Sequence, residues 1–204
     1  MTSSRKADHD HYWRQAEDYA RKADQEEATF RPVTDAMLDA ARIKPGLRLL
    51  DLACGPGTTT AAGAALGAEV LGIDVTPEMV ETARRRFPGV PFAVADMLRP
   101  PDGPWGAIVC RFGAHHAGPA WVPAAYRVLV PGGRIAIAEL VPADGEAAGS
   151  GKRSPDQWAD LLRGAGFADI RTTTVPLAPG AHGTADDPTS REAFLVAATK
   201  PASA

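Results

Sequence analysis

The sequence lacks the features that mark membrane, secreted and nucleic-acid-binding proteins. No apolar stretch reaches the about 20 residues of a membrane-spanning helix, and residues 1–10 are polar, without the apolar run of a secretory signal. Acidic residues outnumber basic ones by 25 to 22, which argues against a partner held through its phosphates. The one basic cluster, Arg84 to Arg86, is expected to face solvent at a helix end. We therefore expect a cytoplasmic protein that binds neither a membrane nor nucleic acid.

Cysteine is also scarce. The two cysteines, Cys54 and Cys110, each lie within an apolar run, and neither has a second metal-ligating residue at a spacing of two. This pattern argues against a disulfide framework and against a zinc motif, and it is typical of reduced, buried cysteines. We expect no metal site.

Short apolar segments alternate with amphipathic ones, a pattern typical of βα units around a parallel sheet. Helices are expected over residues 10–28 and from Pro32 to the Pro45-Gly46 turn. With 204 residues, of which 45% are hydrophobic, the chain suffices for a single α/β domain. We expect residues 1–44 to form a helical cap and residues 45–204 to form a doubly wound, Rossmann-like core. The strands of that core are predicted at 47–52, 69–74, 90–95, 107–110, 134–140, 170–175 and 193–199.

The turn after the first predicted strand contains Gly55-Pro56-Gly57. In a doubly wound sheet this turn lies at the carboxyl ends of the strands, where glycines let a ligand approach the backbone. Pro56 has no N–H, and Thr60 replaces the third small residue of a dinucleotide fingerprint, so the turn is poorly suited to a pyrophosphate. Asp51 would also repel phosphates; its charge favours a ligand with an ammonium group instead.

Two further acidic residues follow the next two strands. Asp74 lies 19 residues after Gly55, close to the usual spacing of a carboxylate that accepts from the two ribose hydroxyls. Asp96 would accept from the exocyclic amine of an adenine, while Met97 packs on the ring. Each acid alone is equally consistent with a solvated strand end. Three of them at successive strand ends, beside a glycine turn, favour a binding site.

These segments resemble those of the seven-stranded, Rossmann-like S-adenosylmethionine-dependent methyltransferases, particularly the branch of ubiquinone and menaquinone biosynthesis methyltransferases. The resemblance extends from about Tyr12 to Lys200. It implies a mostly parallel sheet of strand order 3-2-1-4-5-7-6, with an antiparallel seventh strand. The segments that carry it are residues 49–58, 72–79, 95–97, 111–116, 127–133 and 161–167.

The same resemblance implies S-adenosylmethionine as the cofactor. The residues that it assigns to this cofactor are Asp51, Gly55, Gly57 and the backbone carbonyl of Arg111 for the methionine moiety, Asp74 for the ribose, and Val75, Met79, Asp96 and Met97 for the adenine.

The acceptor side has no diagnostic motif. His115 and His116, after the fourth predicted strand, and Glu139, near the end of the fifth, are candidate general bases for an oxygen or carbon acceptor. An amine acceptor needs no base, and the histidines would then only support their loop. Because they are adjacent on an irregular loop, we expect their side chains to diverge.

The first predicted helix has an aromatic face formed by Tyr12, Trp13 and Tyr19. This face is a candidate lid that shapes an apolar acceptor pocket. Alternatively, the helix packs on the domain and has no direct role in function.

Together, these patterns predict a methyltransferase, monomeric or homodimeric, that acts on an oxygen, nitrogen or carbon atom of a small molecule. Secondary metabolism and quinone-like biosynthesis are the expected settings. Two alternatives stay open at this point. One is a protein that binds S-adenosylmethionine without catalysis. The other is an NAD-dependent oxidoreductase, which Pro56, Thr60 and Asp51 disfavour.

Overall fold

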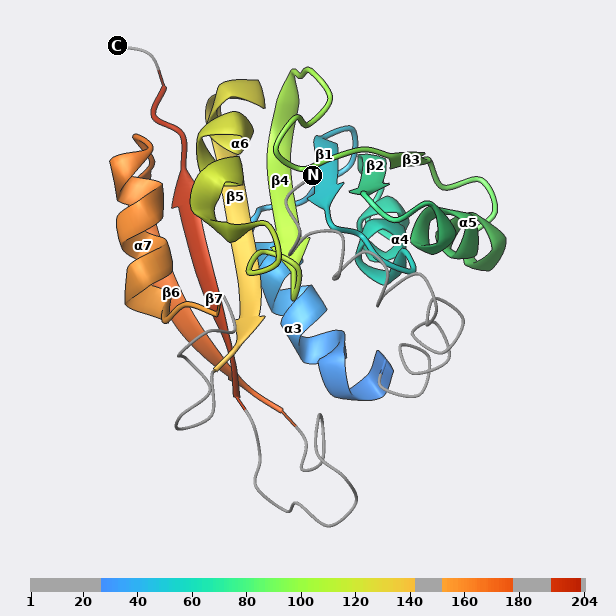
Figure 1. Cartoon of the computed structure of the whole chain (residues 1–204), viewed down its shortest axis with the longest axis horizontal. Coiled ribbons are helices and arrows are strands. Elements are labelled where there is room, and N and C mark those ends of the chain that lie inside the picture. The colour runs from blue at the N-terminus through green and yellow to red at the C-terminus, as the bar shows by residue number, and fades with distance from the viewer. Residues whose placement is uncertain (1–26, 142–151, 178–191, 203–204) are drawn as a thin grey trace, which may run out of the picture.

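The structure, a computed structural model, describes residues 27–141, 152–177 and 192–202. These residues form a seven-stranded sheet with helices on both faces (Figure 1). The sheet has the order β3-β2-β1-β4-β5-β7-β6, which confirms the predicted order. Its strands are β1 (Arg48–Leu52), β2 (Glu69–Asp74), β3 (Phe92–Val94), β4 (Trp105–Arg111), β5 (Leu129–Leu140), β6 (Ala168–Pro176) and β7 (Glu192–Thr199).

The strand order reverses between β1 and β4, and this reversal creates the place for a site. β1 pairs in parallel with both β2 and β4, so that Asp51 lies opposite Gly72 on one side and Val109 on the other. β7 runs antiparallel to β5 and β6. In a doubly wound sheet, ligands bind outside the carboxyl ends of the strands where the order reverses. That edge holds the ends of β1, β2, β4 and β5.

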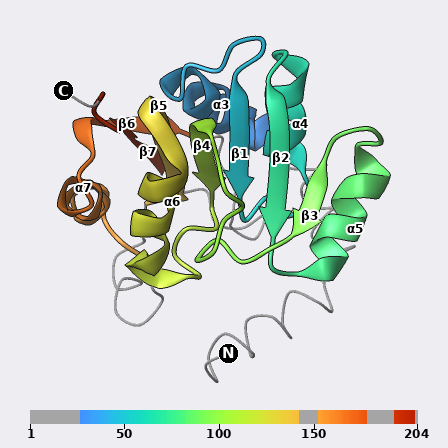
Figure 2. The same cartoon turned by 90° about the horizontal axis from the view of Figure 1, so that it is seen from above.

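Helices cover the two faces of the sheet, with α3 and α4 on one face and α6 and α7 on the other (Figure 2). Because both faces are covered, neighbouring residues of one strand are buried in opposite directions. Leu49 packs in the cluster that contains Val33 and Met37 of α3, and Leu50 packs in the cluster of Trp121 and Trp158. The helices are α3 (Glu27–Ala40), α4 (Thr58–Ala65), α5 (Pro77–Arg86), α6 (Val122–Val128), which follows the 3-10 turn Gly118–Trp121, and α7 (Pro155–Gly164).

The start of α3 differs from the sequence-based expectation. The helix is expected from Pro32, but it already includes Glu27, and Pro32 lies inside it. Phe30 explains the earlier start, because this residue is only 5% exposed and its ring meets that of Phe112. Burial of Phe30 therefore favours helix on the N-terminal side of the proline, at the expense of one main-chain hydrogen bond.

The basic cluster in the last turn of α5 is exposed at Arg84 and Arg85, as expected, whereas Arg86 is half-buried. Arg84 donates to the carbonyl oxygen of Phe92 on β3 (2.6 Å), and Arg86 donates to that of Pro56 (2.5 Å). Arg85 stays on the surface, where it pairs with Glu81. The end of α5 passes close to β3 and the glycine turn, which places two guanidinium groups within reach of main-chain acceptors.

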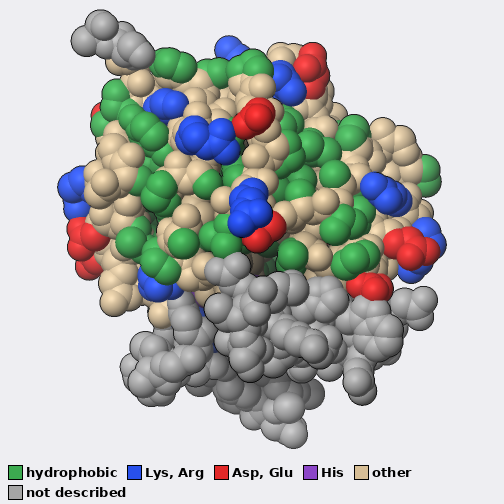
Figure 3. Space-filling view, turned by 45° about the horizontal axis from the view of Figure 1, so that its top comes forward, with side chains coloured by type: hydrophobic (Ala, Val, Ile, Leu, Met, Phe, Trp, Pro, Cys, Tyr) green, Lys and Arg blue, Asp and Glu red, His purple; other side chains and the backbone are tan. Residues whose placement is uncertain are grey.

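Charged groups of both signs are interspersed with apolar ones on the face of the molecule that Figure 3 shows. Among the described residues, every helix is too short or too polar to span a membrane.

Candidate functional site

The glycine turn after β1 has a backbone shape that few side chains tolerate. Gly55 and Gly57 have φ angles of 51° and 91°. A Cβ atom at Gly57 would lie 2.7 Å from a ring carbon of Phe92 and 2.9 Å from Cβ of Ala83. At Gly57 the turn therefore lies against β3 and α5 with no room for a side chain, and Arg86 donates a hydrogen bond to its Pro56 carbonyl oxygen.

Asp51 is the most deeply buried acidic residue of this edge, with 1% of its surface exposed. Its Oδ2 accepts a hydrogen bond from Oγ1 of Thr60 in α4, at 2.6 Å. Burial raises the pKa of Asp51 to about 7, although the hydrogen bond from Thr60 and the charge of Arg111 both act to lower it. A carboxylate in this setting gains stability from a cation that a ligand brings.

Asp74, at the end of β2, is held by two main-chain donors. Its Oδ2 accepts from the N–H of Gly55 and its Oδ1 from the N–H of Thr76, both at 2.9 Å. Burial raises the pKa of Asp74, and these hydrogen bonds oppose that shift. The side chain of Thr76 and the main-chain N–H of Val75 act on the carboxylate in the same direction as these two donors. The contact with Gly55 also joins the ends of β1 and β2.

The residues expected at the adenine differ in accessibility. Val75 is 46% exposed, and Val94 at the end of β3 is 51% exposed, whereas Met79 and Met97 are 3% and 7% exposed. Asp96 lies in the loop after β3 and accepts from the N–H of Leu98 (2.9 Å). Val75 therefore offers apolar surface to a ring, while the two methionines belong to the packed interior.

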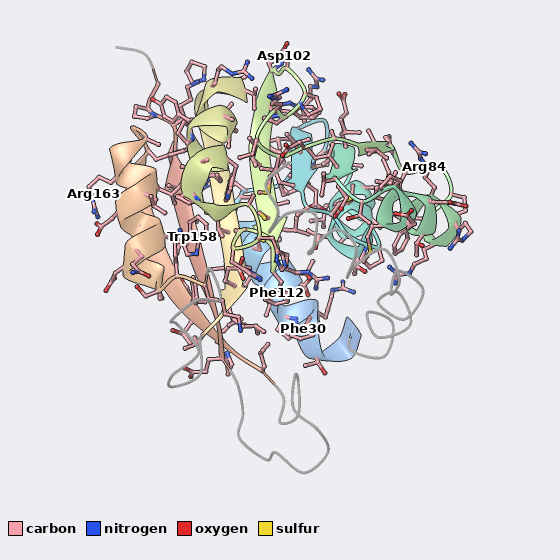
Figure 4. All side chains as sticks on the ribbon, viewed as in Figure 1. Phe30, Arg84, Asp102, Phe112, Trp158 and Arg163 are labelled. Atoms are coloured by element: carbon pink, nitrogen blue, oxygen red, sulfur yellow. The ribbon has the colours of Figure 1, made fainter. Side chains whose placement is uncertain are left out.

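The end of β4 is joined to α3. Arg111 donates through Nη1 to Oγ1 of Thr34 (3.0 Å). Phe112 has a φ of 58°, an uncommon conformation for a residue with a side chain. Its ring meets Phe30 of α3 edge-on, with the ring centroids 5.1 Å apart (Figure 4). Arg111 thus contributes a side-chain charge near Asp51, in addition to the backbone carbonyl that the resemblance assigns to the site.

His115 and Glu139 form a buried pair. Nδ1 of His115 lies 2.9 Å from Oε2 and 3.1 Å from Oε1 of Glu139, and the main-chain N–H of His115 donates to Oε1 at 3.2 Å. The side chains are 15% and 6% exposed. Because a charged carboxylate only accepts, this contact places the imidazole proton on Nδ1. The other ring nitrogen, Nε2, then has a lone pair available.

The two histidine rings do not diverge, contrary to the expectation. Their centroids lie 3.8 Å apart, with the ring planes inclined by 44°. The reason is the tight turn that contains them, in which the N–H of His116 donates to the carbonyl oxygen of Gly113. His116 is the exposed member of the pair.

The structure brings most of the predicted site residues to one edge of the sheet and adds three contacts that sequence reasoning missed. These are the hydrogen bond from Thr60 to Asp51, the one from Arg111 to Thr34, and the pairing of His115 with Glu139. For Thr60 a signal existed, because a hydroxyl residue early in α4 lies within reach of the strand before it. The aromatic candidates Tyr12, Trp13 and Tyr19 lie outside the described residues.

A family model described as a methyltransferase domain matches residues 49–133. The match begins on β1 and includes Asp51, Asp74, Asp96 and Arg111. The chain contains a methyltransferase domain. This finding confirms the family that the sequence resembles.

Two methyltransferases are similar in sequence to this chain. A demethylmenaquinone methyltransferase of Beutenbergia cavernae is 40% identical over 147 residues, which are 70% of this chain and 55% of that protein. A trans-aconitate 2-methyltransferase of Methylobacterium nodulans is 38% identical over 114 residues, 52% of this chain and 43% of that protein. The chain thus spans about half the length of these relatives.

Among solved structures, a phosphoethanolamine N-methyltransferase 2 of Haemonchus contortus in complex with S-adenosyl-L-methionine superimposes with a TM-score of 0.65. The two chains are 20% identical, and the match covers 82% of this chain and 52% of that one. At this level of identity the likeness shows a shared fold.

The burial of Asp51 has a measurable consequence for stability. The pKa of this carboxyl rises from 3.8 to about 7 on folding, so between these pH values the native protein binds more protons than the unfolded chain. The free energy of unfolding therefore falls as the pH rises through this range. Asp51→Asn removes the penalty and retains an acceptor for Thr60. We expect this variant to raise the melting temperature by several degrees at about pH 8 and by much less at about pH 4.

Differential scanning calorimetry across pH checks this expectation. Asp102→Asn is the matched control, because Asp102 is an exposed surface carboxylate (87% exposed side chain). Melting temperatures that depend on pH in the same way in Asp51→Asn and in the wild-type protein would contradict the raised pKa.

Proposed function

We propose that this chain is an S-adenosylmethionine-dependent methyltransferase that acts on an acidic oxygen or carbon atom of a small molecule. The observation that carries this proposal is the buried pair of His115 and Glu139. It lies at the same sheet edge as Asp51 and Asp74. Its histidine lies within residues 49–133, which match the methyltransferase domain family.

The residues of the sheet edge fit S-adenosylmethionine. Asp51 is a buried carboxylate without enough compensating charge to bring its pKa to the ordinary range, and the ammonium group of the cofactor supplies such a charge. Asp74 would accept from the two ribose hydroxyls, and Val75 offers apolar surface beside it for the adenine. Asp96 would accept from the adenine amine. Gly55 and Gly57 keep the turn free of side chains, so that a ligand reaches the backbone.

The same features disfavour NAD, the alternative left open by the sequence. A pyrophosphate at this turn would face the negative charge of Asp51 and would find no N–H at Pro56. The match to the methyltransferase family also argues against an oxidoreductase.

Bound S-adenosylmethionine supplies an electrophilic methyl group on a sulfonium. The chain's own contribution is to align the acceptor, exclude water and remove a proton. In our proposal Nε2 of His115 takes the proton from the acceptor, so that the acceptor O–H or C–H bond breaks and an Nε2–H bond forms. Glu139 keeps the other proton on Nδ1 and stabilises the imidazolium that results. Positioned bases of this kind contribute about 10²–10⁴-fold to a rate.

The pair of His115 and Glu139 narrows the chemical class of the acceptor. The two curated relatives are named for demethylmenaquinone and trans-aconitate, which differ in chemistry. A carboxylate is already ionised near neutral pH, and an amine offers its lone pair directly, so neither needs His115. A phenol, an enol or an activated carbon atom must lose a proton during the reaction. The geometry therefore favours a phenolic, enolic or quinol-type acceptor, as expected for quinone-like or secondary metabolism.

Four sequence-based expectations stay proposals. We propose that residues 1–44 and 45–204 form one domain, within which α3 packs on a sheet face. We propose that the aromatic side chains Tyr12, Trp13 and Tyr19 close over the acceptor. A cytoplasmic location and a monomeric or dimeric state also belong to this proposal.

Cofactor binding gives the first test. We expect S-adenosylhomocysteine to bind in the low-micromolar range, about −7 to −8 kcal/mol, and NAD not to bind. Asp74→Ala should weaken binding by about 2–3 kcal/mol because it removes an acceptor of two hydroxyl groups. Isothermal titration calorimetry measures both effects. Exposed Asp156→Ala is the matched control and should bind like the wild type. Tight NAD binding would refute the cofactor assignment.

Base catalysis gives the second test. Transfer of a labelled methyl group is measured with catechol and reduced menadione as phenolic probes and with trans-aconitate as a carboxylate probe. With a phenolic acceptor, His115→Gln and Glu139→Gln should each lower kcat, His115→Gln by about 10²-fold or more. The acid limb of the pH–rate profile, which protonation of the base produces, should disappear in His115→Gln.

The control for this test is His116→Gln, which should keep the acid limb. An acid limb that persists in His115→Gln would show that this histidine is not the base. Binding of S-adenosylhomocysteine without transfer to any probe would instead favour a non-catalytic binding protein.

A further inference from the structure

Thr60 occupies a position that neither the cofactor assignment nor the base mechanism explains. It is a polar residue with 0% of its surface exposed, in the first turn of α4. Its hydroxyl donates to Oδ2 of Asp51 at 2.6 Å, the shortest contact that Asp51 makes among the described residues. The main-chain N–H of Thr60 also acts on Asp51 in the direction that favours its charged form.

We propose that Thr60 is a positioning residue for the cofactor site. Its hydroxyl holds one oxygen of the Asp51 carboxylate and favours the charged form of the group, so that the other oxygen meets the cofactor's ammonium group. This inference rests on the proposed function, because it deepens the role of Asp51 in that same site.

The groups that face Asp51 explain why one hydroxyl matters so much. Arg111, from β4, supplies the positive charge that favours the ionised carboxylate, while Asp74, from β2, and burial itself oppose it. Burial raises the pKa of the Cys54 and Cys110 thiols, and the charge of Asp51 acts in the same direction, so these neighbours stay neutral. Burial outweighs the hydrogen bond from Thr60 and the charge of Arg111, so the carboxyl is divided between its two states near neutral pH. Loss of one hydrogen bond therefore shifts a large part of the population.

The side chain of Thr60 is held in place by close packing against β2. On the neighbouring strand β2, a Cβ atom at Gly72 would lie 2.5 Å from Oγ1 of Thr60 and 2.7 Å from a ring carbon of Phe92. Only a residue without a side chain fits between them. Gly72 also pairs directly with Asp51 across the sheet. The three residues thus form a continuous chain from β2 through α4 to β1, in which the position of the hydroxyl is determined by packing.

A direct measurement of Asp51 tests the proposal without any cofactor. Carbon-13 NMR titration follows the carboxyl of Asp51 in the wild-type protein and in Thr60→Val, Thr60→Ser and Thr59→Val. Valine has nearly the shape of threonine but no donor, so Thr60→Val should raise the pKa of Asp51 by about one to two pH units. Thr60→Ser retains the donor and should restore the wild-type titration. Thr59→Val, a buried neighbour in the same helix, is the matched control and should leave the titration unchanged.

Affinity for S-adenosylhomocysteine gives the second readout. At about pH 7 we expect Thr60→Val to bind about tenfold more weakly than wild type, because a smaller fraction of Asp51 is charged. This difference should narrow toward about pH 9, and Thr60→Ser should bind like wild type throughout. A purely structural role for Thr60 would lower affinity equally at every pH and would overturn the proposal.

The two readouts separate this inference from the proposed function. If wild-type protein fails to bind S-adenosylhomocysteine at any pH, the cofactor assignment falls, and with it the role of Thr60 in cofactor binding. If the wild-type protein binds but Asp51 titrates identically in Thr60→Val, the positioning role is refuted while the proposed function stands.

Discussion

The structure of this site depends on one buried carboxylate at the point where the strand order reverses. Asp51 lies on β1 between two parallel neighbours, with almost none of its surface in solvent. A charge in such a place is unfavourable unless other groups compensate it. Thr60 and Arg111 compensate it in part, and a cationic ligand completes the balance. The buried charge of Asp51 therefore lowers the stability of the empty protein, and the same charge provides affinity for the ammonium group of a ligand.

Other parts of the fold bring further groups to this carboxylate and arrange the acceptor side next to it. Gly55 connects the turn after β1 to Asp74, and Arg111 connects β4 to α3. His115 lies two residues after Gly113 in the loop that follows β4. Its partner Glu139 comes from β5. The proposed cofactor residues thus lie on the ends of β1 and β2, and the proposed acceptor residues lie on the ends of β4 and β5. The two halves meet at the strand reversal, as in-line transfer between two bound molecules requires.

Local sequence patterns were sufficient to predict all seven strands and the acidic residues at the strand ends. The family resemblance predicted the order of the strands in the sheet. They were insufficient where a contact joins distant segments. Arg111 and Thr34 are 77 residues apart, and His115 and Glu139 are 24 apart, so no spacing rule pairs them. Helix α3 begins before Pro32 because Phe30 packs on Phe112, which is a tertiary contact. Likewise, Arg86 is half-buried because its guanidinium group donates to the carbonyl oxygen of Pro56 in the glycine turn.

Proton release on ligand binding tests the central role of Asp51 most directly. Isothermal titration calorimetry of S-adenosylhomocysteine, repeated in buffers of different ionisation enthalpy, counts the protons that binding releases. Because the pKa of Asp51 lies near 7 in the empty protein, binding of an ammonium group at about pH 6 should release most of one proton. At about pH 8.5 the release should nearly vanish. Tight binding at about pH 6 without proton release would contradict the role of Asp51 as the carboxylate that meets the ligand's positive charge.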